Sequence, residues 1–437
     1  MTIGRFDGSY HNADANVYEN VITSHSSHNL SYYCSEIFTS GRARRMYTTK
    51  EFGVPFLSNS DTSSANPFEG CSYSSKKYGF DERAVLKGGM ILTGRVGAIG
   101  QTSFVPKYWE RYNAMGSDNI IRIVVKPSFK NGFIYAYLAS KIGSLAFLKH
   151  STGGVQPFIT DAMVGGLPIP DFPADFQQEV DDMIQESARL REQAADALNE
   201  AVRLIEDMFP TLESPRYGRT NLKEILQSSG KRFEANFSNS KGKLYDKYIK
   251  ENFEWEPLSE IANVTRPGLF KRCYVENGLM FLGGADIFLA TPQSKKFVSR
   301  TKTADIPTLT IKEGMVLMPR SGTIGDVAIA TSQHAQKLAS EHVIRIYSDN
   351  ILRTAYLYAF LSSSVGKSLI QRYIFGSVIQ HVEPHLLNEI PIPVLDTAVI
   401  ERIGNLALTN KDCLGKAGEL ELAAIAKVEQ EIEKWNN

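Results

Sequence analysis

The sequence of 437 residues predicts a mixed α/β protein with two tandem copies of one domain, each followed by a long helix. The first observation is a repeat: Gly89–Gly100 returns 225 residues later (314 − 89) as Gly314–Gly325. Each copy is an apolar, strand-like run that leads into Arg-x-Gly-x-Ile-Gly, whose glycines suit a tight turn. The second observation is a long heptad pattern after each copy. Solenoid repeats have periods of about 20–50 residues, so this spacing indicates a duplicated domain.

Further segments align between the copies in the same order along the chain. The aligned pairs are Arg5–Asn12 with Arg232–Asn239, Arg44–Tyr47 with Lys271–Tyr274, and Ser117–Ile123 with Ser340–Ile346. The offset is 227 for the first two pairs (232 − 5) and 223 for the last (340 − 117). Offsets that drift so little require only small loop insertions, so we expect the same order of elements in both copies.

Each copy then predicts a strand, a helix and a stiff exit. Alternation of apolar and polar residues predicts strands at Ile120–Val125 and Val343–Ile346. The helices are expected through Phe133–Leu138 and Tyr356–Leu361. The exits are Pro168–Pro170 and Pro391–Pro393, both Pro-Ile-Pro, which we expect to stop regular structure.

A long helix is predicted over Asp175–Phe209, which corresponds to roughly 52 Å at 1.5 Å per residue. Apolar or small residues recur at alternating steps of four and three, as in the a/d seam of a coiled coil. The seam comprises Phe176, Val180, Met183, Ser187, Leu190, Ala194, Ala197, Ala201, Leu204 and Met208, and only Ser187 is polar. Pro210 ends the helix.

A second, weaker seam follows the second copy. It runs through Val399, Ile403, Leu406, Asn410, Cys413, Ala417 and Leu420, and then shifts phase to Ile425, Val428 and Ile432. Gly404, Gly415 and Gly418 interrupt it, and a glycine inside a helix costs about 1 kcal/mol relative to alanine. Seams this long and narrow usually pair with another helix, so we expect the two to pack together. The alternative is that each helix packs on its own domain.

The composition favours a soluble binding protein in a reducing compartment. Lys+Arg and Asp+Glu both number 48, so the net charge is zero and a uniformly basic surface is excluded. The four cysteines form no CxxC pair, which gives no sign of a zinc module or a disulfide framework. The N-terminal residues do not lead into a signal-peptide core, and no uncharged apolar run approaches 18 residues. We therefore expect a cytoplasmic protein without a membrane segment.

The sequence shows no catalytic signature. It contains no glycine loop of the kind that binds S-adenosylmethionine, no Asp…Glu-x-Lys nuclease pattern and no phosphate-binding loop. The eight histidines lack metal-ligand spacing, so no metal site is expected. Asn66-Pro67-Phe68 is interpreted as a turn. We expect a protein that is not an enzyme and has no catalytic residue of its own.

Basic residues interleaved with aromatic residues are the positive signal, because they are typical of nucleic-acid surfaces. The candidates are Arg42, Arg44, Arg45, Tyr47, Lys76 and Lys77 in the first copy, and Lys271, Arg272, Tyr274, Lys295, Lys296 and Arg300 in the second. Arginine forks suit guanine edges, and lysines suit phosphates. For each charged residue the alternative is an ordinary solvated surface.

The duplication divides these candidates into residues expected to read bases and residues expected to serve the fold or contact phosphates. If the two copies read different bases, base-reading residues should differ between them, and shared residues should serve the fold or contact phosphates. Arg95 and Arg320 are shared by the two turns and are therefore candidates for phosphate contact, with a structural role as the alternative. The divergent loops Ser58–Ala84 and Gly283–Thr308 are better candidates for base reading.

This order of parts resembles the specificity (S) subunit of type I restriction–modification systems. The resemblance covers nearly the whole chain and rests on four motifs that each occur twice: the Arg-Phe opening, the Arg-x-Gly-x-Ile-Gly turn, the Pro-Ile-Pro exit and the following helix. It implies two target-recognition domains held apart by an antiparallel pair of helices, related by a pseudo-two-fold axis. The glycines of the second helix depart from the family pattern, and we expect this helix to span roughly Val399–Lys434.

The resemblance also implies domain limits. These are residues 1–172 for the first target-recognition domain, 173–212 for the first spacer helix, 213–230 for a connector, 231–395 for the second domain and 396–437 for the second spacer helix.

The implied partners are double-stranded DNA with a split, asymmetric site, two methyltransferase (M) subunits, and restriction (R) subunits that bind through them. S-adenosylmethionine, ATP and Mg would belong to those partner subunits. The alternative function is a scaffold whose tandem domains bind a protein or another ligand without DNA, and an independent enzyme is a third.

Overall fold

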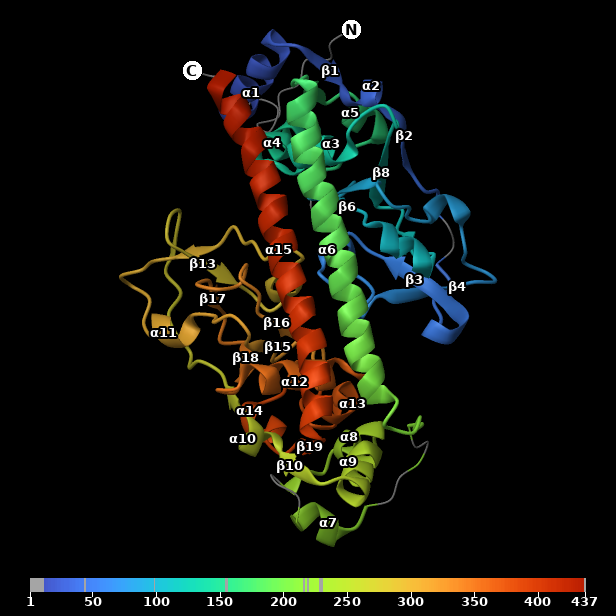
Figure 1. The fold of residues 1–437 in the computed structure, drawn as a ribbon, viewed down its shortest axis with the longest axis vertical. Helices are drawn as coiled ribbons and strands as arrows, with labels where there is room; N and C mark the ends of the chain where they lie inside the picture. Colours follow the sequence, from blue (N-terminus) through green and yellow to red (C-terminus); the bar gives the residue numbers. More distant parts are fainter. Residues whose placement is uncertain are drawn as a thin grey trace. The chain divides into compact units, whose positions relative to one another are not determined.

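The computed structural model describes residues 12–42, 45–97, 99–153, 156–214, 217, 220–227 and 231–435. The chain divides into two compact units. Unit 1 comprises Met1–Glu192 with Lys416–Asn437, and unit 2 comprises Gln193–Gly415. The elements of these units confirm the mixed α/β fold (Figure 1). Within the described ranges, no helix is long and apolar enough to cross a membrane.

The described part of unit 1 contains two sheets and a two-stranded ribbon. The antiparallel sheet has the order β2 (Cys34–Thr39), β8 (Ile120–Val125), β5 (Ile91–Gly94) and β6 (Thr102–Phe104). The smaller sheet has the order β4 (Ser72–Ser75), β3 (Gly53–Leu57) and β7 (Met115–Gly116), and the ribbon pairs β1 (Ser27–Asn29) with β9 (Pro168–Pro170). The helices are α1 (Ala13–Ser24), α2 (Leu30–Tyr33), α3 (Asn131–Ala139), α4 (Lys141–His150) and α5 (Asp161–Gly165).

Unit 2 repeats this arrangement. Its antiparallel sheet has the order β11 (Asn263–Thr265), β18 (Val343–Tyr347), β15 (Val316–Pro319) and β16 (Ala328–Ile329). The second sheet has the order β12 (Tyr274–Val275), β14 (Phe297–Val298), β13 (Leu279–Leu282) and β17 (Leu338–Ala339), and the ribbon pairs β10 (Trp255–Pro257) with β19 (Pro391–Pro393). The helices are α7 (Leu222–Gln227), α8 (Ala235–Ser238), α9 (Lys241–Asn252), α10 (Leu258–Ile261), α11 (Ile306–Leu309), α12 (Ile351–Ser362), α13 (Ser364–Arg372) and α14 (Pro384–Leu387).

The two units share strand order and strand direction, which confirms the duplication. In each antiparallel sheet the strand before the Arg-x-Gly-x-Ile-Gly turn, β5 or β15, lies beside β8 or β18. In each second sheet one pair is parallel, β3 with β7 and β13 with β17. The turns have glycines at positive φ, +82° at Gly97 and +86° at Gly322, as their sequences predict.

The expectation that Pro-Ile-Pro stops regular structure is wrong. Both motifs form short strands, with Ile169 opposite His28 and Ile392 opposite Glu256. Proline cannot donate a backbone hydrogen bond, but it is tolerated in edge strands, and a two-stranded ribbon consists only of edges.

A buried arginine joins the two sheets of each unit, and we call it the staple. In unit 1, Arg122 of β8 donates hydrogen bonds to the carbonyl oxygens of Ala84 (3.0 Å), Gly116 (2.6 Å) and Ile120 (2.8 Å). In unit 2, Arg345 of β18 donates to those of Leu309 (3.0 Å), Ala339 (3.0 Å) and Val343 (2.8 Å). Burial lowers the pKa of both guanidinium groups to about 10. Each staple satisfies three carbonyls from different parts of its repeat.

The long helices α6 (Ala174–Glu206) and α15 (Thr397–Trp435) pack against each other in antiparallel directions, as the resemblance implies (Figure 1). Helix α6 ends three residues before the predicted Phe209. In unit 1, Lys427 pairs with Glu179 at 2.7 Å and Ser187 Oγ donates to Ala417 O at 2.8 Å. In unit 2, Asn410 Nδ2 donates to Ala194 O at 2.9 Å and Arg402 lies 3.5 Å from Glu200.

The polar seam residues Ser187 and Asn410 therefore have equivalent roles. They are 223 positions apart, as are the carbonyls of Ala194 and Ala417 that accept their hydrogen bonds. Both side chains are buried, with exposed fractions of 2% and 3%. A buried polar residue in an apolar seam favours one register of the helix pair, because other registers leave it without a partner.

The glycines of the second seam do not break α15, which is a continuous helix of 39 residues. Gly404 lies against α12, where a Cβ atom would be 2.8 Å from the carbonyl oxygen of Leu352. Gly415 lies against Ser332, whose Oγ would be 2.9 Å from such an atom. The bounds of α15, Thr397–Trp435, agree with the expected helix, and these two glycines permit close packing on unit 2.

Each long helix contributes to both hydrophobic cores. The core of unit 1 includes Val180 and Ile184 of α6, and Ala424, Val428 and Ile432 of α15. The core of unit 2 includes Ala201 and Ile205 of α6, and Ile403 and Ala407 of α15. In unit 1, buried Glu421 of α15 also accepts hydrogen bonds from Tyr135 of α3 and Arg191 of α6.

We predict that Arg345→Met destabilises unit 2 by about 3 kcal/mol or more, because three buried carbonyls lose their donor at about 1–3 kcal/mol each. The free energy of unfolding would be measured in urea. Arg300→Met, at an exposed position, is the control and should change it by less than about 0.5 kcal/mol. Equal losses in the two variants would show that the staple does not stabilise the fold.

We also predict that Gly404→Ala destabilises the protein by about 1–3 kcal/mol, because the added methyl group would overlap Leu352 O. In an uncrowded helix the same change would stabilise by about 1 kcal/mol. Asn405→Ala, at the exposed neighbouring position, is the matched control and should be neutral or stabilising. Thermal unfolding distinguishes the two, and a higher melting temperature for Gly404→Ala would contradict the close approach.

Candidate nucleic-acid interface

The candidate interface of each unit is centred on an edge segment, which we define as residues 45–48 in unit 1 and 271–275 in unit 2. In unit 1, the segment pairs with β4: Ser75 N donates to Met46 O at 2.8 Å and Thr48 N to Tyr73 O at 3.0 Å. In unit 2, β12 pairs with β14, with Tyr274 opposite Val298. The two segments thus occupy the same edge of equivalent sheets.

The edge segment brings together basic clusters that are separate in sequence. In unit 1, the exposed Lys76 and Lys77 follow β4, and Lys77 Nζ lies 5.0 Å from the centre of the Tyr78 ring. In unit 2, the exposed Lys295 and Lys296 precede β14 and the exposed Arg300 follows it. Tyr47 and Tyr274 on the edge segments are 57% and 51% exposed, so each edge presents an aromatic ring beside lysines.

An arginine of each edge segment forms an ion pair with an acidic residue just before β8 or β18, a contact we call the latch. Arg45 lies 2.7 Å from Asp118, and Arg272 lies 2.6 Å from Glu341. The hydrogen bond to Glu341 raises the pKa of Arg272. Burial opposes the ionisation of Glu341, but hydrogen bonds with Arg272, the backbone and Ser340, together with the charge of Arg272, outweigh this and lower its pKa.

The latch indicates different roles for neighbouring basic residues. Arg45 and Arg272 fix the edge segment, and their charge is balanced by the acid. Arg42 also approaches Asp118, at 3.7 Å, but its side chain is 93% exposed, so this pair is weak. Lys271 is exposed beside Arg272. Arg44 lies outside the described residues.

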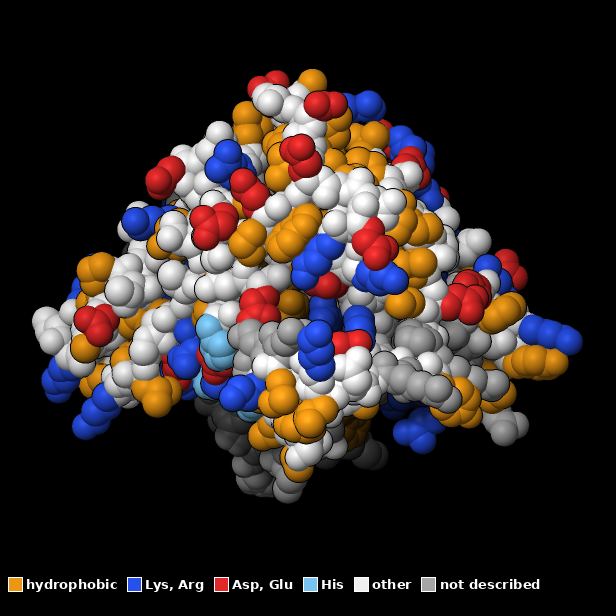
Figure 2. Space-filling model, turned by 90° about the horizontal axis from the view of Figure 1, so that it is seen from below, with side chains coloured by type: hydrophobic (Ala, Val, Ile, Leu, Met, Phe, Trp, Pro, Cys, Tyr) orange, Lys and Arg blue, Asp and Glu red, His pale blue; other side chains and the backbone are white. Residues whose placement is uncertain are grey.

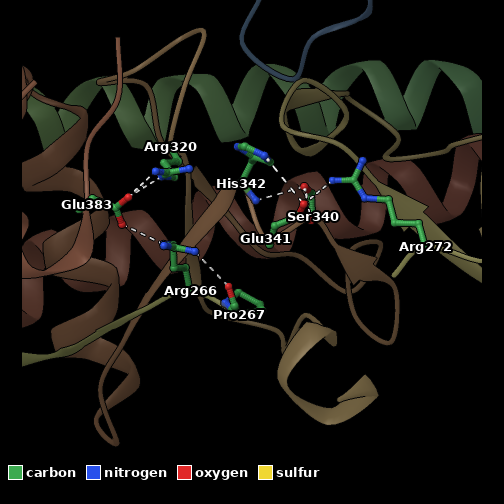
Figure 3. A network of polar contacts seen from close by, with 8 residues as sticks. All are labelled: Arg266, Pro267, Arg272, Arg320, Ser340, Glu341, His342 and Glu383. Atoms are coloured by element: carbon green, nitrogen blue, oxygen red, sulfur yellow. Dashed lines mark hydrogen bonds and ion pairs between the residues drawn. The ribbon is translucent and has the colours of Figure 1, made fainter. Parts of the chain in front are cut away.

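The arginines of the two turns have equivalent backbone contacts. Arg95 N donates to Asn119 O at 2.8 Å and Arg320 N to His342 O at 2.7 Å. The Arg320 side chain also pairs with Glu383 at 2.5 Å, and Arg266 approaches the other oxygen of that carboxylate at 2.9 Å. Figure 3 shows both arginines directed at Glu383, with His342 between this group and the latch of Arg272. These contacts support the structural alternative for Arg320.

Burial opposes the ionisation of Glu383, but hydrogen bonds from Arg266 and Arg320 outweigh it and lower the pKa of that carboxyl group. Because two arginines pair with a single carboxylate, the group of Arg266, Arg320 and Glu383 has a net positive charge.

Sequence reasoning missed the acidic partners Asp118, Glu341 and Glu383. The signal for the first two was present, because an acid follows serine at the same place in the aligned segments Ser117–Ile123 and Ser340–Ile346. Among the described residues, no group of three or more His, Cys, Asp or Glu side chains could hold a metal ion.

The surface charge is mixed, as the zero net charge requires. On the face drawn in Figure 2, Lys and Arg side chains are interspersed with Asp and Glu side chains and with hydrophobic patches. A nucleic-acid interface on this protein must therefore use local clusters such as those of the edge segments.

Comparison with known proteins finds a family match for part of the sequence. Residues 250–397 match the family model described as the type I restriction modification DNA specificity domain. No curated protein is detectably similar in sequence.

Solved structures that match this chain include the S subunit of a type I restriction–modification system from M. genitalium, at 12% identity, 94% coverage of this chain, 95% coverage of that chain and a TM-score of 0.34. The HsdS subunit from Thermoanaerobacter tengcongensis is 14% identical, with coverages of 93% and 95% and a TM-score of 0.27. The family match confirms the resemblance to type I specificity subunits over residues 250–397.

Proposed function

We propose that this chain is the DNA-recognition subunit of a type I restriction–modification complex. The observation that carries the proposal is the duplicated edge segment, which lies inside the matched family domain in unit 2 and has an equivalent in unit 1. Each segment carries an exposed tyrosine and a latched arginine, and exposed lysines flank the strand that pairs with it. Lysines suit phosphates, and aromatic rings suit bases.

The two repeats would read the two halves of a bipartite, asymmetric site. The shared latch and staple support this, because they keep the scaffold constant while the loops Ser58–Ala84 and Gly283–Thr308 differ in sequence. Double-stranded DNA is thus the proposed ligand, and the chain itself supplies no catalytic group.

The helix pair would dock two M subunits and set the spacer between the half-sites. The register contacts of Ser187 and Asn410 support a stiff pair. S-adenosylmethionine, ATP and Mg would be bound by the M and R subunits, with the R subunits recruited through the M subunits. Co-purification from the host tests the assembly: a methyltransferase should accompany the chain, and the complex should methylate a split site.

We predict that Lys295→Ala with Lys296→Ala weakens binding of the assembled complex to all duplexes about equally. If both lysines contact phosphates, the slope of log affinity against log salt should fall by about two, one for each contact. The matched control is Lys247→Ala on α9, whose side chain is 70% exposed. Fluorescence titrations at several salt concentrations give both quantities. An unchanged slope would show that the two lysines are ordinary surface residues.

We further predict that residues 1–172, exchanged for the equivalent segment of a related subunit, change one half of the methylated sequence only. The reason is that each repeat has its own edge segment and divergent loops. Methylome sequencing of a host with the hybrid chain measures this. The reciprocal exchange of residues 231–395 is the control and should change the other half. Changes in both halves from one exchange would contradict independent reading.

A further inference from the structure

A short β-hairpin in unit 2 presents two aliphatic side chains to solvent. Phe375 and His381 close it with reciprocal backbone hydrogen bonds of 2.9 and 2.8 Å, and Gly376 begins its turn at a φ of +97°. At its tip, the side chains of Val378 and Ile379 are 93% and 63% exposed. Two adjacent aliphatic side chains exposed to this degree are available for contact with a partner.

The hairpin is built onto the Arg-x-Gly-x-Ile-Gly turn. His381 forms a backbone bridge with Ser321, and Val382 N donates to Arg320 O at 3.0 Å. Beside this bridge, Gly322 has a φ of +86°, and a Cβ atom there would meet nothing within 4 Å. The hairpin and the turn thus form one paired-loop element, and the turn leaves open space at its glycine.

The base of this element is positively charged. Arg320 and Arg266 share the single carboxylate of Glu383, and His342 contributes the carbonyl that holds Arg320 N (Figure 3). Apolar side chains at the tip and cations at the base are the two kinds of group that contact base edges and phosphates, respectively.

The backbone frame of this element recurs in unit 1, where residues 154 and 155 at the tip lie outside the described residues. Thr152 and Phe158 exchange backbone hydrogen bonds of 2.9 and 2.7 Å, and Ile159 N donates to Arg95 O at 2.9 Å. Gly153 has a φ of +101°, and Gly97 of the adjoining turn also faces open space. The residues at the ends of the two hairpins are 223 positions apart, the offset of the surrounding strands. Because both repeats share this backbone frame, we expect it to serve the function that the repeats have in common.

The dimensions favour DNA over a protein partner. A stable protein interface buries about 800 Å² on each side, far more than two aliphatic side chains supply. A two-stranded ribbon, in contrast, fits the major groove of B-DNA, where apolar side chains contact the methyl group of thymine.

We infer that the hairpin Phe375–His381 enters a DNA groove, and that Val378 and Ile379 make apolar contact with base edges in the half-site read by unit 2. This inference rests on the proposed function and adds a base-reading element outside the divergent loops. Arg320 and Arg266 position the hairpin and lie beside the phosphates that flank the contacted bases.

The test uses the complex that co-purifies with the full chain and a duplex with the sequence that this complex methylates. The double variant Val378→Ser, Ile379→Ser should bind that duplex about tenfold or more weakly, because the apolar contacts are lost. Its affinity for an unrelated duplex and its salt slope should not change, since no charge is removed. Val394→Ser, at an exposed position after β19, is the matched control and should bind like the wild type.

A second measurement identifies the partner directly. Benzoylphenylalanine in place of Val378 should crosslink to the duplex on irradiation, whereas the same substitution at Val394 should not. Crosslinking to another protein subunit, or wild-type affinity of the double serine variant, would overturn the inference. A wild-type complex that binds no duplex would instead refute the proposed function, so the two failures are distinct.

Discussion

A buried guanidinium group fixes the part of each repeat on which the proposed interface depends. Arg122 and Arg345 have no acidic partner among their hydrogen-bond acceptors and donate to backbone carbonyls. Burial of a charge is costly unless hydrogen bonds compensate for the lost hydration, so the three carbonyls must stay in place. The staple therefore helps to set the spacing between the two sheets of each unit.

The staple also positions the edge segment, through the short chain segment that carries the acid of the latch. The acid of the latch, Asp118 or Glu341, lies between β7 and β8 or between β17 and β18, the two strands that the staple connects. The acid in turn holds Arg45 or Arg272 of the edge segment. An exposed edge is thus positioned by a buried group two steps away. Loops can then differ between the repeats without a change in the frame that carries them.

The sequence predicts features that depend on local pattern. The glycine turns, β8 and β18, the start of α3 and the seam of α6 all follow from periodicity and residue type. Features that depend on distant partners were missed or mistaken. The latches join residues 73 and 69 positions apart, and Pro-Ile-Pro forms a strand only because β1 or β10 lies beside it. The role of Gly404 likewise depends on where α12 lies.

Unit 1 is built from two separate segments of the chain and unit 2 from one, and this difference affects the order in which they can fold during synthesis. Unit 2 is one continuous segment, Gln193–Gly415, whereas unit 1 needs Lys416–Asn437 in addition to the first 192 residues. On the ribosome, unit 2 can complete its core before residues 416–437 are synthesised. Unit 1, although made first, lacks Ala424, Val428 and Ile432 until the last helical turns emerge. The N-terminal repeat is therefore the last to close, and a premature stop near the C-terminus would damage the repeat that was translated first.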